Sequence, residues 1–357
     1  MVIGLLSIFC LGAGLLSGPT PRAALLVLEK EQNTLVVVDP VSQKIVGRVP
    51  AGNDPHEVAV GDDGRTAYIS NYHGKDGSGG TTISVVDLVA QKPLPAINLG
   101  ALRAPHGLAF AKGKLWFTAE GAKVVGSYDP ATRTIDWVVG TGEDRTHMVL
   151  VSSDGKTIFT SNVSSATVSI VEQRAGQMRP GGPPPGAPPS PPPGAPRGGP
   201  GRPGGPPPAD WHVTNVAVGQ GAEGFDLSPD GRELWVANAQ DQTISVVDVA
   251  KRTVVQTLPS TKAANRLKFT TDGKYVFVSD LASSEMLVID AKARREFKRI
   301  TLAGNSEGIL MSPDGMHVYT TLNSRDAVAV IDLKTMAVTA EIKTGRGPDG
   351  LAWATRK

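Results

Sequence analysis

Residues 223–258 read Glu223-Gly-Phe-Asp-Leu-Ser-Pro-Asp-Gly-Arg-Glu-Leu-Trp-Val-Ala-Asn238, then Thr243-Ile-Ser-Val-Val-Asp248, then Arg252-Thr-Val-Val-Gln-Thr-Leu258. This stretch holds four short segments with the apolar, β-branched and aromatic residues typical of β-strands. Turn-forming residues separate the segments, and Asp-Gly supplies the positive-φ position that a short hairpin needs. The stretch therefore predicts a unit of four antiparallel strands.

The same unit returns seven times along the chain. The residue just before its first strand serves as a marker, and the markers are His56, His106, His147, Glu223, Asn265, Glu307 and Asp349. The last four markers, at positions 223, 265, 307 and 349, are each 42 residues apart. A fixed period of this size with four strands per unit predicts an all-β, seven-bladed β-propeller.

Both ends of the chain are expected to build the last blade. The chain continues for only eight residues beyond Asp349, enough for one strand over Gly350–Thr355. The other three strands are predicted near the start, over Leu25–Leu28, Thr34–Val38 and Lys44–Val49. This arrangement closes the ring and removes free sheet edges, which would otherwise pair with other chains.

The repeat is similar to the YVTN family of propeller repeats. The shared pattern is Ser-Pro-Asp-Gly, then a strand ending in Asn, then Ile-Ser-Val-Val-Asp, and its best local matches are Trp235-Val-Ala-Asn238, Thr160-Ser-Asn162 and Tyr68-Ile-Ser-Asn71. The resemblance covers nearly all of the chain beyond residue 22 and implies a WD-like, extracytoplasmic or surface protein. Related seven-bladed propellers include lactonases, a metal-dependent antibiotic-ring lyase and the haem domain of some nitrite reductases. One blade, with Pro105-His-Gly-Leu-Ala-Phe110 and Leu115-Trp-Phe-Thr-Ala-Glu120, resembles that lyase.

Composition and the first residues indicate an exported protein. Residues Val2–Leu16 form an apolar run followed by small residues, so segment 1–22 is interpreted as a signal peptide or N-terminal anchor. The only cysteine, Cys10, lies in this run, which excludes disulfides and thiolate metal sites from residues 23–357. The net charge is +2 and basic residues do not cluster, so no nucleic-acid partner is predicted. We expect a periplasmic or extracellular monomer.

A Pro/Gly-rich insert interrupts the third blade. It covers residues 176–210 and is predicted to be disordered because it has almost no side chains to bury. It occupies the place of a hairpin loop between the third and fourth strands of that blade. Its role is open between a tolerated surface insertion and a polyproline ligand or cell-wall spacer.

The markers are the candidate binding site, because each is expected at the entrance of an innermost strand, facing the central channel. All seven are polar, and loops on the same face add further candidates. The predicted ligand-binding residues are His56, His106, His147, Glu223, Asn265, Glu307, Asp349, His73 and Arg145. Three histidines on adjacent blades, His56, His106 and His147, are the predicted metal ligands, with a divalent ion as candidate cofactor. The alternative is a structural role, in which such histidines hydrogen-bond within the blades.

Three functions remain open on the sequence. The favoured one is an exported binding scaffold that holds a small molecule, a metal ion or a protein partner at the channel mouth. The second is a metal-assisted lyase or lactonase at the same mouth, with His106 or His147 as general base beside Glu223. The third is a structural envelope or surface protein. No Gly-x-Ser-x-Gly or His-Glu-x-x-His motif occurs, and no catalytic residue is assigned.

Overall fold

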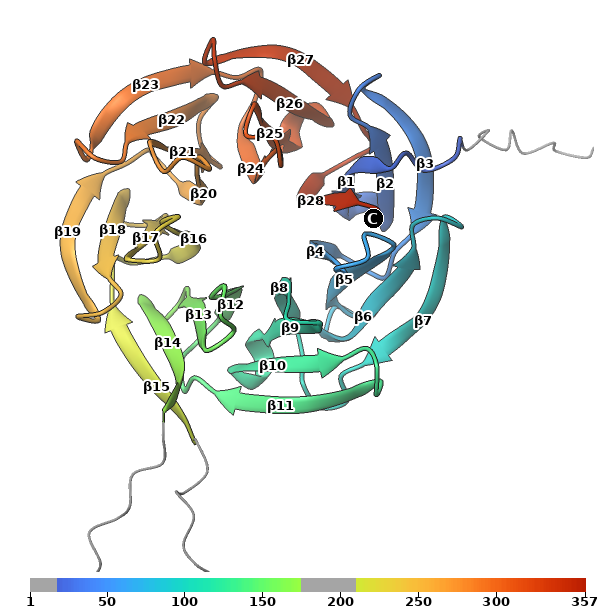
Figure 1. The fold of residues 1–357 in the computed structure, drawn as a ribbon, viewed down its shortest axis with the longest axis horizontal. Helices are drawn as coiled ribbons and strands as arrows, with labels where there is room; N and C mark the ends of the chain where they lie inside the picture. The colour runs from blue at the N-terminus through green and yellow to red at the C-terminus, as the bar shows by residue number, and fades with distance from the viewer. Residues whose placement is uncertain (1–17, 175–209) are drawn as a thin grey trace, which may run out of the picture.

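The computed structural model describes residues 18–174 and 210–357 and shows a closed ring of seven four-stranded antiparallel sheets (Figure 1). This confirms the predicted all-β, seven-bladed propeller. From the axis outward, the blades are β4 (Pro55–Val60), β5 (Thr66–His73), β6 (Gly79–Asp87), β7 (Lys92–Asn98); β8 (Pro105–Ala111), β9 (Lys114–Ala119), β10 (Val124–Asp129), β11 (Thr134–Gly140); β12 (Thr146–Val151), β13 (Thr157–Asn162), β14 (Thr167–Arg174), β15 (Asp210–Ala217); β16 (Ala222–Leu227), β17 (Glu233–Asn238), β18 (Thr243–Asp248), β19 (Thr253–Pro259); β20 (Ala264–Phe269), β21 (Tyr275–Asp280), β22 (Glu285–Asp290), β23 (Arg295–Thr301); β24 (Ser306–Met311), β25 (His317–Leu322), β26 (Ala327–Asp332), β27 (Ala337–Lys343); and β28 (Pro348–Thr355), β1 (Ala23–Glu29), β2 (Thr34–Asp39), β3 (Lys44–Pro50). They are blades 1 to 7 in that order.

Blade 7 is shared by the two ends of the chain, as predicted. Strand β28 lies innermost and pairs with β1, with Ala23 opposite Thr355 and Leu26 opposite Ala352. Strands β2 and β3 follow outward. The last strand of the chain therefore closes the ring by pairing with the first.

The repeat motif has a structural explanation inside the blades that carry it, which for the Asn are blades 1, 3 and 4. The Asn that ends the second strand donates to two hydroxyls of the third strand; Asn238, for example, lies 3.0 Å from Thr243 Oγ1 and 2.9 Å from Ser245 Oγ. The Gly of the Asp-Gly turn adopts positive φ, as at Gly231 (74°). These residues maintain the blade, and so they carry no information about a ligand.

The hydrophobic core lies between the blades. One cluster joins Trp235 and Ile244 of blade 4 to Leu267 and Val278 of blade 5, and similar clusters join other neighbouring blades. Burying one such side chain contributes about 1.5–3 kcal/mol. Packing between sheets therefore fixes the position of each innermost strand around the axis.

Three 3₁₀ turns connect second and third strands: η1 (Lys30–Gln32), η2 (Glu120–Ala122) and η3 (Asn323–Arg325). They lie on the face of the ring where the innermost strands begin. Within residues 18–174 and 210–357, no helix is long and apolar enough to span a lipid bilayer.

Two sequence predictions fall mainly outside the described residues. Of the predicted signal or anchor segment 1–22, only residues 18–22 are described, and Thr20 is buried there, its hydroxyl donating to Leu88 O. Of the predicted insert 176–210, only Asp210 is described, and it is the first residue of β15. Both predictions stay predictions.

The register of β14 and β15 leads to a test of the insert. Arg174 pairs directly with Asp210, so these strands form a complete hairpin ladder up to residues 174 and 210. Replacing residues 175–209 by a four-residue Gly/Ser loop is expected to preserve the fold. It should raise the free energy of unfolding by up to about 2 kcal/mol, because a shorter loop costs less entropy to close. Urea unfolding of both proteins measures this, and a less stable shortened protein would contradict it.

Candidate functional site

The seven markers lie inside the innermost strands, one position further in than predicted. Each is the second residue of its strand, because the residue before it already pairs with the second strand, as Pro55 does with Asn71 and Ser306 with Leu322. The register then shifts between Pro55 and Val58, which is a β-bulge. A bulge bends a strand and redirects a side chain, so it turns the marker residues toward the channel.

The residue after each marker sets how closely neighbouring inner strands approach. In four blades it is glycine, and a Cβ at Gly308 would lie 2.2 Å from Asp349 O, while one at Gly350 would lie 2.3 Å from His56 O. No side chain fits at such distances. These glycines allow the inner strands to pack tightly around the axis, which brings the marker side chains together.

The three predicted histidines lie together on one side of the mouth, with His106 packed on His147 and His56 edge-on to His106. The ring centroids of His106 and His147 are 3.7 Å apart with an interplanar angle of 31°, and those of His56 and His106 are 5.1 Å apart. Tyr72 packs against His56 and His106, at 4.7 and 5.3 Å. The prediction that these histidines meet at the channel mouth is therefore matched by the geometry.

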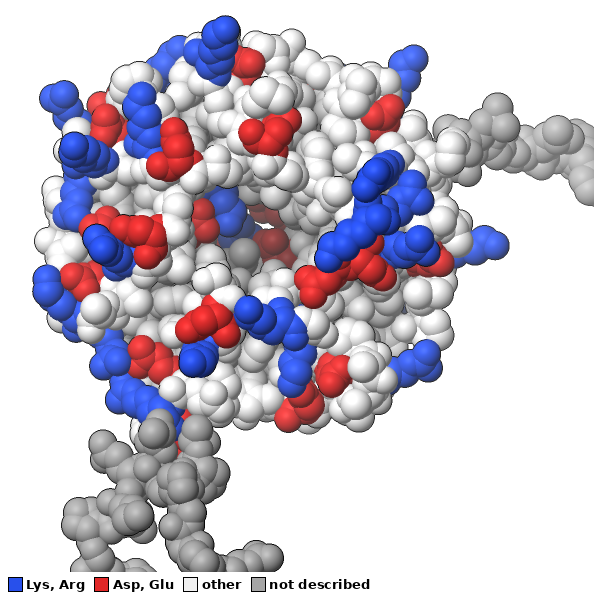
Figure 2. All heavy atoms as spheres, in the orientation of Figure 1, with Lys and Arg blue, Asp and Glu red and all other residues white. Residues whose placement is uncertain are grey.

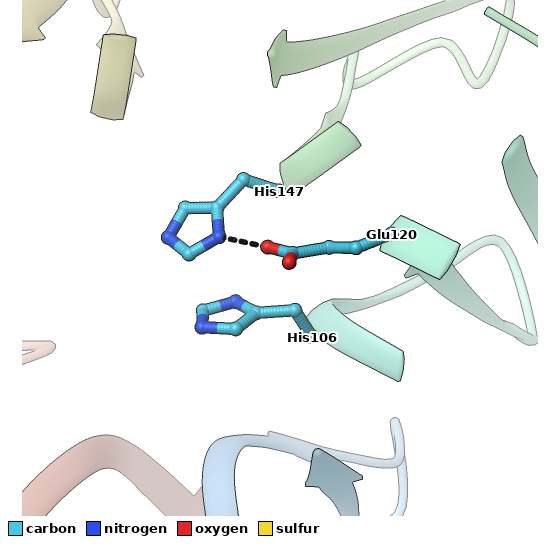
Figure 3. A group of neighbouring side chains, drawn as sticks. All are labelled: His106, Glu120 and His147. Atoms are coloured by element: carbon cyan, nitrogen blue, oxygen red, sulfur yellow. Dashed lines mark hydrogen bonds and ion pairs between the residues drawn. The ribbon is translucent and has the colours of Figure 1, made fainter. Parts of the chain in front are cut away.

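Glu120, the first residue of η2, organises this side of the mouth. Its Oε1 lies 2.5 Å from Nδ1 of His147, and its Oε2 accepts from the Tyr72 hydroxyl and lies 3.5 Å from Nε of Arg145. The other ring nitrogen of His147 lies 3.0 Å from Oε2 of Glu223. His147 is thus held between two carboxylates while it stacks on His106 (Figure 3).

These contacts set the protonation of the two buried imidazoles. Burial lowers the pKa of His106 well below its usual value, and the charge of His147 lowers it further, so His106 is neutral. Burial also opposes charge on His147, but its hydrogen bonds to Glu120 and Glu223 raise its pKa overall. Although burial favours the neutral acid, His147 lowers the pKa of Glu223 to about 2. The two stacked imidazoles therefore differ in pKa, with His147 protonated more readily than His106.

Acid should weaken the folded protein through Glu223. Because its pKa is lowered from 4.5 to about 2, its contribution to stability is present above pH 4.5 and is lost as the pH falls toward 2. The stability advantage of the wild type over Glu223→Gln is expected to shrink by about 2 kcal/mol between pH 7 and pH 3. Urea unfolding of both proteins, without added metal, measures this. An advantage that stays constant with pH would contradict the prediction.

Acidic markers occupy the other side of the mouth and share one lysine. Lys30, the first residue of η1, lies 3.1 Å from Asp349 Oδ2 and 3.4 Å from Glu307 Oε1. Asn323, the first residue of η3, donates to Glu307 at 2.9 Å. Burial raises the pKa of Glu307, and the neighbouring Asp349 raises it further. Figure 2 shows acidic and basic side chains within the central opening of the ring.

One ion pair crosses the channel just inside the mouth. Arg266, which follows marker Asn265 in blade 5, binds Glu57, which follows marker His56 in blade 1. Blades 1 and 5 are not neighbours in the ring (Figure 1), so the two side chains meet over the axis. Both are largely buried, with 11% and 14% of their side chains exposed.

At one position in the channel mouth, the arrangement of possible ligand atoms suits a metal ion. Among the described residues, His106, Glu120 and His147 each offer a ligand atom within 4.8 Å of the other two, and all three are buried. Nδ1 of His106 is buried without a hydrogen-bond partner in the part of the chain that the structure describes, and it faces His147 and Glu120 (Figure 3). The predicted triad His56, His106 and His147 stays a prediction, and the structure groups Glu120, rather than His56, with the other two histidines. Nδ1 of His56 instead lies 3.0 Å from Asp54 O.

The remaining predicted residues differ in position. Arg145 contacts Glu120 at the mouth. His73 is 47% exposed and pairs with Asp54, so it lies at the rim. Asn265 is buried, and no hydrogen bond between described side chains joins it to another marker. The structure thus places Arg145 against Glu120 and His73 at the rim, while Asn265 stays a predicted ligand-binding residue.

Sequence reasoning missed several residues that build the mouth. Lys30, Tyr72 and Asn323 were not among its candidates, and Glu120 was named only as part of the blade that resembles the lyase. These four residues all follow the second strand of a blade or lie near its end. That shared position was the available signal. Arg266 and Glu57 had a second signal, since they replace the glycine that four of the other five blades carry after the marker.

Known proteins share the fold of this chain at low sequence identity. A protein of unknown function from Desulfotomaculum acetoxidans has a TM-score of 0.71 and 11% identity, covering 94% of this chain and 99% of that chain. A candidate 6-phosphogluconolactonase from Bacteroides uniformis has a TM-score of 0.65 and 14% identity, covering 93% and 99%. The dihydro-heme d1 dehydrogenase NirN, in complex with DHE, has a TM-score of 0.61 and 14% identity, covering 90% and 63%.

No curated protein matches the sequence. Residues 206–354 match the family described as YNCE-like β-propeller, which covers blades 4 to 6 and parts of blades 3 and 7. This match and the observed ring confirm the resemblance to YVTN-type propeller repeats. The chain is a seven-bladed β-propeller with a YNCE-like repeat over residues 206–354.

Proposed function

We propose that the protein is an exported binding scaffold whose channel mouth holds a divalent transition-metal ion through His106, Glu120 and His147. One observation carries this proposal: three buried ligand groups converge within 4.8 Å, and one of them, His106 Nδ1, has no hydrogen-bond partner within residues 18–174 and 210–357. A buried polar atom without a partner costs about 1–3 kcal/mol. Coordination would satisfy it.

The surrounding residues support this role. A metal at Nδ1 of His147 would displace that nitrogen's proton, while Nε2–H would continue to donate to Glu223. A carboxylate behind a metal-bound histidine orients the ring and makes it a better ligand. Tyr72 would hold the other oxygen of Glu120 in the same way. Two imidazoles and one carboxylate favour Zn²⁺ or Cu²⁺ over Mg²⁺, and three protein ligands leave a coordination position for a small ligand.

Metal analysis of the purified protein tests the proposal. After reconstitution with Zn²⁺ and dialysis, the protein is expected to retain about one ion per chain, and the double variant His106→Ala/His147→Ala is expected to retain none. The matched control is His212→Ala, because His212 is exposed in β15. Equal zinc in the double variant and the wild type would refute the proposed site. A metal-free wild type would favour the purely structural role.

Export is part of the proposal and has its own test. It is supported by the apolar run Val2–Leu16 and by the absence of cysteine from residues 23–357. Fractionation of the native host with an antibody should find the protein outside the cytoplasm. A cytoplasmic protein would contradict export without affecting the metal site.

A metal-assisted lyase or lactonase is the second candidate, and His56 is the observation in its favour. Donation from its Nδ1 to Asp54 O would leave Nε2 free to accept a proton, close to His106. A metal-bound water or substrate beside this nitrogen would have a general base. The fold shared with a candidate 6-phosphogluconolactonase adds lactones to the substrates worth testing. Turnover of a lactone panel that disappears in His56→Ala, with zinc retained, would establish it.

A further inference from the structure

Deeper in the channel than the mouth, the wall is apolar in every blade. The residue two positions after each marker is hydrophobic, and together these residues form a ring that lines a cavity of about 200 Å³. The ring consists of Val58, Leu108, Val149, Phe225, Leu267, Ile309 and Leu351. At the marker and at the position after it, the type of side chain changes from blade to blade, whereas this position is hydrophobic in all seven blades.

The ion pair between Arg266 and Glu57 lies at the boundary between the channel mouth and this apolar ring. Arg266 and Glu57 are one residue closer to the mouth than the ring residues of their own strands, and both also line the cavity. Nη2 of Arg266 binds Glu57, whereas Nη1 is buried and has no hydrogen-bond partner among the described side chains and backbone. Within the described residues, the cavity therefore combines an apolar ring with the buried Nη1 donor of Arg266, while Lys268, also at its wall, pairs with Asp226.

The charges near Arg266 determine which acceptor can use that donor. Burial opposes the charge of Arg266, but its pKa is raised by Glu57 and, more weakly, by Asp349, Glu223 and Glu307. The guanidinium is thus already surrounded by carboxylates. A further anion would be repelled by them, and a cation would meet Arg266 itself and Lys268 at the cavity wall. An uncharged acceptor such as a carbonyl oxygen avoids both penalties.

We propose that this part of the channel, here called the inner channel site, binds a small uncharged molecule with an apolar body and one carbonyl acceptor. The carbonyl oxygen accepts from Nη1 of Arg266, and the apolar body packs against the ring that includes Leu108 and Leu351. An apolar cavity of about 150 Å³ can hold benzene, so a six-membered ring with a small substituent suits the volume here. The inner channel site requires no metal and is independent of the metal-binding proposal.

Cyclohexanone is the probe for the test, titrated by calorimetry and ligand-observed NMR into the full-length protein after removal of metal with EDTA. We expect saturable binding of cyclohexanone. Cyclohexanecarboxylate and cyclohexylammonium, which have the same ring, should bind at least ten-fold more weakly. No binding of cyclohexanone, or tighter binding of either ion, would overturn the proposal. Because metal is absent, either outcome leaves the proposed metal site untouched.

Two variants localise the probe. Leu108→Trp fills the cavity and should reduce cyclohexanone binding at least ten-fold, whereas Leu94→Trp, at an exposed position of β7, should not change it.

Arg266→Lys keeps a cation for Glu57 but removes Nη1, so it should abolish the preference for cyclohexanone over methylenecyclohexane. Leu351→Phe replaces Leu108→Trp if circular dichroism shows that the latter is unfolded. Wild-type binding in a folded cavity-filling variant, or an unchanged preference in Arg266→Lys, would place the probe elsewhere.

Discussion

Replacing His147 by alanine is expected to lower the affinity of the channel mouth for Zn²⁺ by at least about 100-fold. Removing even a residue that only orients a ligand typically costs 10–100-fold, and His147 is proposed as a ligand itself. Its loss also frees Glu120 and Glu223, which both bind its ring. The two carboxylates would then sit near one another without the imidazole between them, so the remaining ligands would lose their positions.

Competition titration against a chromogenic zinc chelator measures this effect. Three variants with graded expectations make the result specific. His147→Ala should lose most of the affinity, Glu223→Gln should lose about 10–100-fold because Glu223 only orients the ring, and His212→Ala should lose none. Equal losses in all three variants would indicate a general loss of structure. Unchanged affinity in His147→Ala would show that the ion binds elsewhere.

Deleting strand β28 is expected to prevent the ring from folding. Residues Pro348–Thr355 form the innermost strand of blade 7 and supply Asp349 to the mouth. Without them, β1 loses a partner along its whole length, from Ala23 to Glu29, and the ring loses its closure. The free energy of unfolding of a whole domain is only about 5–15 kcal/mol. Losing the innermost strand of one blade is expected to remove an amount of similar size.

Circular dichroism and size-exclusion chromatography would show the result. The truncation that ends at Gly347 should be unfolded or aggregated, because β1 would present an open edge. A truncation after Thr355 keeps β28 and is the matched control, and it should fold. A folded, monomeric protein without β28 would show that the closure contributes little to stability.

The fold could be predicted from the sequence because the residues that define the repeat are also the residues that hold a blade together. The Asp-Gly turns, the Asn at the end of the second strand and the alternating third strand each have one local role, and the structure shows each role within a single blade. The closure of blade 7 followed from counting strands at both ends. Only the marker position was misjudged, because the bulge after Pro55 and its equivalents leaves no trace in hydrophobic alternation.

The site could be predicted only in part, because it depends on contacts between blades. The histidines are adjacent in the repeat, and so their meeting at the mouth could be inferred. The role of Glu120 could not, since it depends on how η2 of blade 2 reaches His147 of blade 3. The pairing of Arg266 with Glu57 is less accessible still, because it joins blades on opposite sides of the axis. Composition alone does not encode such distances.

The most direct test of the central claim is anomalous diffraction at the zinc edge from crystals grown with Zn²⁺. A zinc ion held by this site should give a peak at the channel mouth, about 2.0–2.2 Å from Nδ1 of His106, Nδ1 of His147 and one carboxylate oxygen of Glu120. Nε2 of His147 should still contact Glu223. A map with no peak at the mouth, while His147 remains hydrogen-bonded to both carboxylates, would contradict it.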